Sequence, residues 1–160
     1  MGYDEIRVTT KDEAYMLEAL KEAACAAHQG EVPVGAVIVL NDEIIARSHN
    51  MVESDRRSYA HAEMLAIDAA EKLLDAKWLR DATMYVTLEP CSMCAGAMVL
   101  ARIKRLVIGA ADPKTGACGS VLSVADSDVL NHRIEMTTGV LEEECSNILK
   151  EFFRNKRNNK

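Results

Sequence analysis

The chain has 160 residues, of which 49% are hydrophobic and 28% are charged, and this composition is ordinary for a soluble globular protein of one domain. It excludes a mainly disordered, collagen-like or coiled-coil chain, and no apolar run approaches the roughly 20 residues that a bilayer-spanning helix needs. The length predicts a single domain over 1–160. The N-terminal segment carries no apolar signal core, so we expect a cytoplasmic protein.

Charge is distributed unevenly along the chain. The formal net charge is −6, but residues 150–160 carry +4 and the remainder carries −10. A basic C-terminal helix or tail on an acidic protein indicates a local contact with an anionic partner such as nucleic acid. Taken alone, however, the pattern favours a solvated, frayed terminus.

The first half of the chain predicts a helix followed by a hairpin. Thr10 and Glu13 have the spacing of a capping box, and apolar residues at helical spacing follow as far as Gly30. The elements expected next are a strand over 34–40, a turn at Asn41–Asp42, a returning strand over 43–48 and a polar loop over 49–59.

The second half predicts helices alternating with strands. In chain order we expect a helix over 61–74, a strand over 83–88, a helix over 91–101, a strand over 105–110, a loop over 111–120, a weak helix over 121–130, a strand over 134–138 and a helix over 141–154. Strands separated by helices run parallel. The order therefore predicts an α/β fold of three layers, with a mixed sheet of about five strands and helices on both faces.

The five cysteines are Cys25, Cys91, Cys94, Cys118 and Cys145. An odd number without a signal peptide makes a disulfide framework a poor interpretation. Cys91 and Cys94 lie three residues apart at a predicted helix start, where the partial positive charge of the helix favours the thiolate that binds metals. Taken alone, this pair indicates half of a metal site, a redox pair or part of a structural zinc knuckle.

The segment His61-Ala62-Glu63 favours a catalytic metal over these alternatives. His61 supplies a third ligand to Cys91 and Cys94, and three protein ligands leave one tetrahedral position of a Zn²⁺ ion open. In a regular helix His61 and Glu63 point about 200° apart, so both face one site only if His61 lies at or before the helix start. Glu63 is then placed to take a proton from metal-activated water as the catalytic residue.

These two motifs resemble those of the cytidine/deoxycytidylate deaminase superfamily of zinc deaminases, in which the glutamate of H-x-E is the acid/base residue. Within it, the chain is most similar to the bacterial tRNA-specific adenosine deaminases. The resemblance runs from the first helix to about Arg157 and includes Pro33-Val34-Gly35-Ala36-Val37, His49-Asn50, Ala60-His61-Ala62-Glu63, Tyr85 to Cys91, Gly109-Ala110, Lys114-Thr115-Gly116, Asn131-His132-Arg133 and Phe152-Phe153-Arg154.

The resemblance implies a cytidine-deaminase-like fold, one Zn²⁺ per subunit, a homodimer, and hydrolytic deamination of adenosine to inosine at the wobble position of tRNA anticodons. It assigns the metal to His61, Cys91 and Cys94, and the proton transfers to Glu63. The residues that it places at the base or at the anticodon stem-loop are Val34, Asn50, Ala62 through its backbone N–H, Asp112, Lys114, Asn131, Phe153 and Arg154.

Two other functions remain compatible with the sequence. A zinc deaminase of small nucleobases such as guanine or cytosine would share the metal and Glu63 but would need no basic tail. A non-enzymatic, zinc-stabilised RNA-binding module would make Glu63 incidental. Adjacent residues cannot share a helix face, so we expect one of Phe152 and Phe153 to point inward and the other to lie near RNA.

Overall fold

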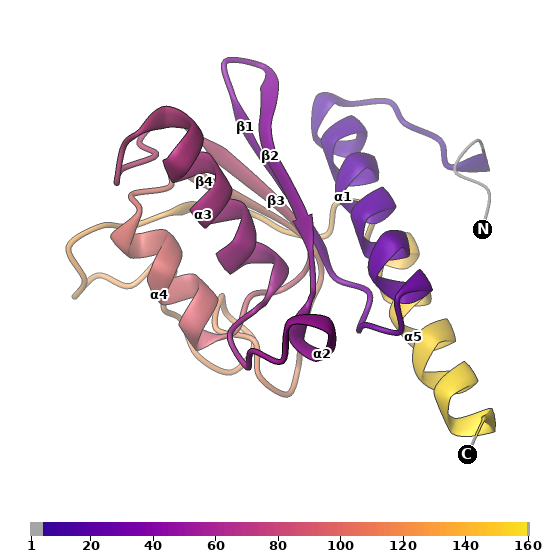
Figure 1. Ribbon diagram of the computed structural model, residues 1–160. Helices are drawn as coiled ribbons and strands as arrows, with labels where there is room; N and C mark the ends of the chain where they lie inside the picture. The colour runs from indigo at the N-terminus through magenta and orange to yellow at the C-terminus, as the bar shows by residue number, and fades with distance from the viewer. Residues whose placement is uncertain (1–4, 160) are drawn as a thin grey trace.

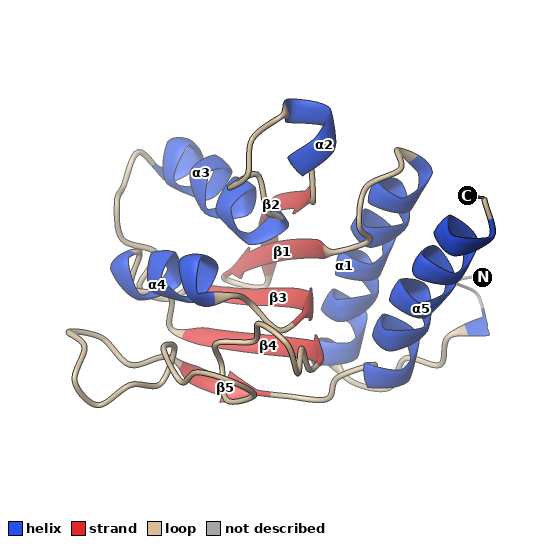
Figure 2. Cartoon of the chain, turned by 90° about the horizontal axis from the view of Figure 1, so that it is seen from below, coloured by secondary structure: helices blue, strands red, loops and turns tan. Residues whose placement is uncertain are grey.

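A computed structural model describes residues 5–159, in which a mixed sheet of five strands is central (Figure 2). The strands are β1 (Gly35–Leu40), β2 (Glu43–His49), β3 (Thr83–Leu88), β4 (Arg105–Ala110) and β5 (Glu135–Thr137). Their order in the sheet is β2-β1-β3-β4-β5. β1 runs antiparallel to both β2 and β3, whereas β3, β4 and β5 are mutually parallel. The parallel pairing was predicted, although the structure has no helix in residues 111–134, between β4 and β5.

Helices cover both faces of the sheet (Figure 1). One face carries α1 (Lys11–His28) and α5 (Glu142–Asn158), and the other carries α3 (Ala62–Leu74) and α4 (Ser92–Leu100). The short α2 (Val52–Asp55) lies in the connection between β2 and α3. This confirms the predicted three-layer α/β fold. Among residues 5–159, the structure contains no helix with the length and apolar character needed to cross a membrane.

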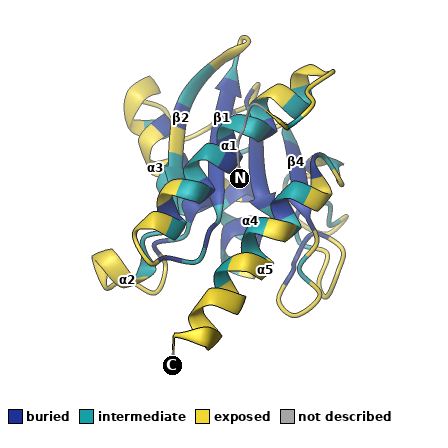
Figure 3. Cartoon of the chain, turned by 90° about the vertical axis from the view of Figure 1, so that its right-hand side faces the viewer, coloured by how far each residue is buried: buried dark blue, intermediate teal, exposed yellow. Residues whose placement is uncertain are grey.

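Two apolar clusters, one on each face of the sheet, form the core. One cluster joins α3 and α4 to the sheet and includes Ile38, Met84, Met98 and Leu106, all fully buried. The other packs α1 and α5 on the opposite face, around residues such as Met16. Figure 3 shows the buried strands between partly exposed helices, with the C-terminal half of α5 extending into solvent.

Local signals account for the first helix and the hairpin. The side chain of Thr10 accepts a hydrogen bond from the backbone N–H of Glu13, and the Glu13 carboxylate accepts from the N–H of Thr10, which completes the capping box. Asn41 and Asp42 both have positive φ, 52° and 61°, as a two-residue hairpin turn of type I′ requires.

Two predicted segments were wrong. The polar stretch 49–59 contains the helix α2, and the stretch 121–130 contains no helix. In the latter, the N–H of Val124 donates to the carbonyl of Ala117, and the N–H groups of Val121 and Leu122 donate to the carbonyl of Gly116. These partners, five to seven residues back in the chain, replace the i→i−4 bonds of a helix, so turn hydrogen bonds overrode a weak helical pattern.

Candidate active site

Several strand ends meet at one edge of the sheet. Gly35 pairs with His49, and Ala36 pairs with Val86, so the beginning of β1 lies beside the ends of β2 and β3. Leu88 at the end of β3 pairs with Ala110 at the end of β4. The segments that enter or leave these ends, around residues 34, 50, 89–91 and 112, are therefore brought together by the sheet register.

His61, Cys91 and Cys94 form the cluster that the motif spacing predicted. His61 is the N-cap of α3 with extended backbone angles, φ −77° and ψ 151°, and Cys91 is the N-cap of α4. The Nδ1 of His61 lies 3.6 Å from the Sγ of Cys91 and 3.5 Å from the Sγ of Cys94. Ligands of a tetrahedral zinc ion, with bonds of about 2.3 Å to sulfur and about 2.0 Å to nitrogen, are themselves about 3.6 Å apart. The donor set and its spacing fit such an ion.

The charges of the cluster are mutually dependent. Hydrogen bonds from Cys94 and His61 lower the pKa of Cys91 to about 3. The neighbouring Cys91 and burial raise the pKa of Cys94, and contact with Cys91 raises that of His61. The ionised thiolate of Cys91 thus disfavours ionisation of Cys94. A divalent cation bound between the two sulfur atoms would offset the repulsion between two thiolates.

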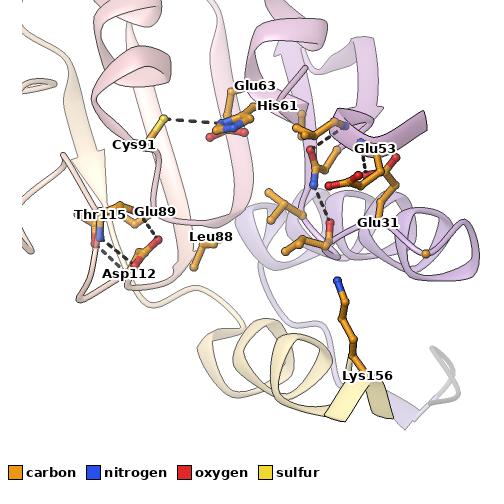
Figure 4. Close-up of a pocket in the computed structure, with 16 residues that line it drawn as sticks. Glu31, Glu53, His61, Glu63, Leu88, Glu89, Cys91, Asp112, Thr115 and Lys156 are labelled. Atoms are coloured by element: carbon orange, nitrogen blue, oxygen red, sulfur yellow. Dashed lines mark hydrogen bonds between the residues drawn. The ribbon is translucent and has the colours of Figure 1, made fainter. Parts of the chain in front are cut away.

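Glu63 is a buried carboxyl group beside this cluster. It is only 4% exposed, and it occupies the first turn of α3 one residue after Ala62. Figure 4 shows it next to His61 and facing the same space as Cys91. Burial raises the pKa of Glu63 to about 7, a value at which a group both accepts and releases protons near neutral pH.

A cavity of about 290 Å³ opens in front of these side chains. Its lining includes seven of the residues that sequence reasoning assigned to the site: Val34, Asn50, His61, Ala62, Glu63, Cys91 and Asp112. Cys94 is fully buried behind it. Ala62 is the first residue of α3, so its N–H belongs to the helix-start donors that have no intrahelical acceptor.

Comparison with known proteins shows which family the chain belongs to. The model of the MafB19-like deaminase family matches residues 10–157. A tRNA-specific adenosine deaminase of Bacillus subtilis is 55% identical over 94% of each chain. The chain belongs to the family of tRNA-specific adenosine deaminases. A solved structure from biochemical and structural studies of A-to-I editing by tRNA:A34 deaminases at the wobble position is 43% identical, covering 85% of this chain and 99% of that chain, with a TM-score of 0.82.

A guanine deaminase from Nitrosomonas europaea shares the fold at a lower level. It is 27% identical, covers 94% of this chain and 88% of that chain, and gives a TM-score of 0.75. The fold of tRNA-specific adenosine deaminases is thus shared with deaminases of free bases.

Four of the predicted substrate residues of this deaminase lie outside the cavity. Lys114, Phe153 and Arg154 line a separate groove between α5 and the loop that follows β4, together with Lys150 and Arg157. The loop connects the two concavities, because Thr115 lines the cavity and its neighbour Lys114 lines the groove. Asn131 is exposed and belongs to neither set of lining residues.

The two phenylalanines of α5 differ in exposure. Phe152 is half-buried and lines a groove shared with α1, whereas Phe153 is 41% exposed. Lys156 follows Phe152 by four residues and therefore lies on the same helix face. It reaches the cavity lining (Figure 4), a role that sequence reasoning missed although the i, i+4 spacing from Phe152 contained the signal.

Sequence reasoning also missed two buried carboxylates, Glu31 and Glu89, which line the cavity of this deaminase. They are 0% and 5% exposed, respectively. Each lies close to a predicted site residue, since Glu31 is three residues before Val34 and Glu89 is two residues before Cys91. A charged residue adjoining a buried strand was the available signal, but its partners are distant in sequence.

Proposed function

We propose that this protein hydrolyses adenosine to inosine and ammonia at the wobble position of tRNA anticodons. The observation that carries the proposal is the placement of Glu63 beside the His61–Cys91–Cys94 cluster at a cavity next to a basic groove. The named function of the Bacillus subtilis relative and the wobble-editing structure support the choice of substrate.

We propose that His61, Cys91 and Cys94 hold one Zn²⁺ per subunit. Soft thiolates with one imidazole are ligands that suit zinc, and three of them leave one coordination position for water. Zinc bound there would supply Lewis acidity that brings the pKa of a water molecule to about 7.

The proton transfers are assigned to Glu63. A carboxyl group with a pKa of about 7 accepts a proton from the attacking water at neutral pH and returns it to N1 of adenine as C6 becomes tetrahedral. The same group then takes the proton of the new C6 hydroxyl and delivers it to the amino group, so that the C6–N bond breaks, the C6 carbonyl of inosine forms and ammonia leaves. Burial of Glu63 keeps bulk water from exchanging that proton before it is used.

The remaining cavity residues orient the base. The free backbone N–H of Ala62 and the amide of Asn50 are polar partners for the base and sugar of a flipped nucleotide, and Val34 gives an apolar surface against the ring. Asp112 organises its own loop, because its carboxylate accepts hydrogen bonds from the N–H groups of Lys114 and Thr115.

The anticodon stem-loop is proposed to follow the groove beside α5. Lys114, Arg154 and their basic neighbours offer positive charge to phosphates, and the exposed ring of Phe153 offers a face for base stacking. Asn131 is proposed to contact only those parts of the RNA that lie outside the cavity. Residues 1–160 would act as one deaminase domain with this basic helix at its end.

We propose a homodimer in the cytoplasm, where tRNA is processed. Exposed large apolar side chains support self-association, among them Leu73 at 64%, Leu100 at 76% and Val129 at 89% exposure. Light scattering of the purified protein measures the mass directly, and a monomer at micromolar concentration would contradict the proposal.

The function is tested by nucleoside mass spectrometry. The protein is incubated with an anticodon stem-loop that carries adenosine at the wobble position, and separately with adenosine, adenine, guanine and cytosine. The matched control is the same stem-loop with that adenosine replaced by guanosine. Inosine from the first stem-loop alone is the expected result. Deamination of a free base alone would instead identify a small-molecule deaminase.

A further inference from the structure

Glu31 is a buried carboxylate whose partners, Glu53 and Ser54, lie in α2 itself. Its oxygens accept hydrogen bonds from the N–H of Glu53 at 3.0 Å, the N–H of Ser54 at 2.6 Å and the hydroxyl of Ser54 at 2.6 Å. The N-cap residue of α2, Met51, provides no side-chain cap. Glu31 therefore supplies from a distant part of the chain the acceptor that the first turn of α2 lacks.

Glu89 has the same relation to the loop after β4. Its carboxylate accepts hydrogen bonds from the N–H groups of Asp112 at 3.1 Å, Cys118 at 3.0 Å and Ser120 at 3.1 Å, and from the hydroxyl of Ser120. These contacts span nine residues of loop. Every partner is a donor, so a carboxylate with its several lone pairs satisfies them and an amide does not.

The backbone of the loop after β4 passes close to the carboxylate of Glu89 at Gly116. A Cβ added at Gly116 would collide with the carboxylate of Glu89, so the loop approaches this group more closely than any other residue type allows. The loop thereby keeps Thr115 on the cavity side and Lys114 on the groove side.

The two carboxylates hold different walls of one cavity. Figure 4 shows Glu31 with Glu53 on one side, and Glu89 with Asp112 and Thr115 on the other, with His61 and Glu63 between them. Both walls are connecting segments rather than strands of the sheet, so their shape depends on such contacts.

We propose that Glu31 and Glu89 are positioning residues that hold the two loop walls of the substrate cavity at the spacing that a flipped nucleotide requires. Neither group is assigned a part in proton transfer. The consequence for substrate recognition rests on the proposed function, whereas the holding of the loops does not.

The holding of the loops is tested by amide hydrogen exchange, read by NMR on the full-length metal-loaded protein without RNA. Glu89→Gln should accelerate exchange about ten-fold at Asp112, Cys118 and Ser120 while leaving Glu53 and Ser54 unchanged. Glu31→Gln should give the reverse pattern, so each variant is the matched control for the other. Uniform acceleration in both variants, or none, would overturn the proposal.

The effect on substrate is tested by the kinetics of the same variants. Each should raise KM for the anticodon stem-loop about ten-fold and change kcat by less than about three-fold, with bound metal unchanged. A fall in kcat with unaltered KM, or loss of metal, would overturn the positioning role. If the unsubstituted protein makes no inosine, the proposed function fails. The exchange pattern still tests whether Glu31 and Glu89 hold the loops.

Two milder variants cover the case in which a buried carboxylate cannot be replaced without unfolding. Ser120→Ala and Ser54→Ala each remove one hydroxyl donor and leave the buried charge in place. The same selective exchange pattern is expected at smaller amplitude, and its absence counts against the proposal.

Discussion

Replacing Glu63 with glutamine tests two consequences of burying a carboxyl group beside His61, Cys91 and Cys94: its role in proton transfer and its effect on stability at alkaline pH. The amide has nearly the same volume but neither gains nor loses a proton at neutral pH. If Glu63 carries both proton transfers, turnover of the stem-loop should fall by about 10³-fold or more, since general acid–base catalysis contributes about 10²–10⁴-fold. Metal content should be unchanged, because Glu63 is not among the three proposed ligands.

The same substitution should stabilise the metal-free protein at alkaline pH. Burial raises the pKa of Glu63 from 4.5 to about 7, and each pH unit corresponds to about 1.4 kcal/mol, so ionising the buried group costs about 3 kcal/mol. A raised carboxyl pKa gives stability that is present below pH 4.5 and is lost as pH rises through about 7. Glutamine does not ionise and is not subject to this loss.

The assay is urea unfolding of chelator-treated protein at pH 5 and pH 8, with Glu143→Gln on the exposed side of α5 as the control. Glu63→Gln should gain stability over the unsubstituted protein as pH rises, by about 3 kcal/mol at most, and Glu143→Gln should not. Turnover within ten-fold of the unsubstituted protein would refute the catalytic role. Lower stability of Glu63→Gln at pH 8 would refute the argument from burial.

Three further variants test the metal cluster, the fold and the groove. Cys91→Ser should abolish bound zinc by elemental analysis, whereas Cys25→Ser, at an exposed cysteine, should keep it. Asp12→Asn breaks the pair with Arg105, whose nitrogens lie 2.9 and 2.6 Å from the Asp12 carboxylate. It should cost about 2 kcal/mol in urea unfolding at pH 7. The hydrogen bond from Arg105 lowers the pKa of Asp12, so this difference should persist above pH 3.8 and vanish as pH falls further; a constant difference would contradict the ion pair. Arg154→Ala should raise KM for the stem-loop and reduce the salt slope of binding by about 0.7, and an unchanged slope would remove the groove from the RNA path.

Local sequence patterns were sufficient for most of the secondary structure. β3 and β4 have the predicted bounds, 83–88 and 105–110, because short β-branched runs between helical patterns leave few alternatives. The cluster of His61, Cys91 and Cys94 was equally predictable. Histidine and cysteine at helix starts are specified by a few neighbouring residues. The need for His61 and Glu63 to face one site placed His61 at or before the helix start, and the structure has it at the N-cap.

Tertiary contacts decided what those patterns could not specify. The partners of Glu31 and Glu89 lie 22 to 31 residues away, and no periodicity records which loop amides will meet a carboxylate. The stretch 121–130 has weak helical spacing but donates its N–H groups to the preceding loop, and Lys114 and Asn131 lie outside the cavity that the resemblance suggested.

The sequence by itself predicted the layered fold, the cluster of His61, Cys91 and Cys94 and the position of Glu63 beside it, because short motifs carry these signals although His61 and Cys91 lie 30 residues apart. Only the tertiary structure decided the walls of the cavity, the position of Lys156 and the separation of the cavity from the basic groove. Those features arise where connecting segments pack against one another at the edge of the sheet, and the free energy that fixes them comes from long-range hydrogen bonds and burial rather than from local preference.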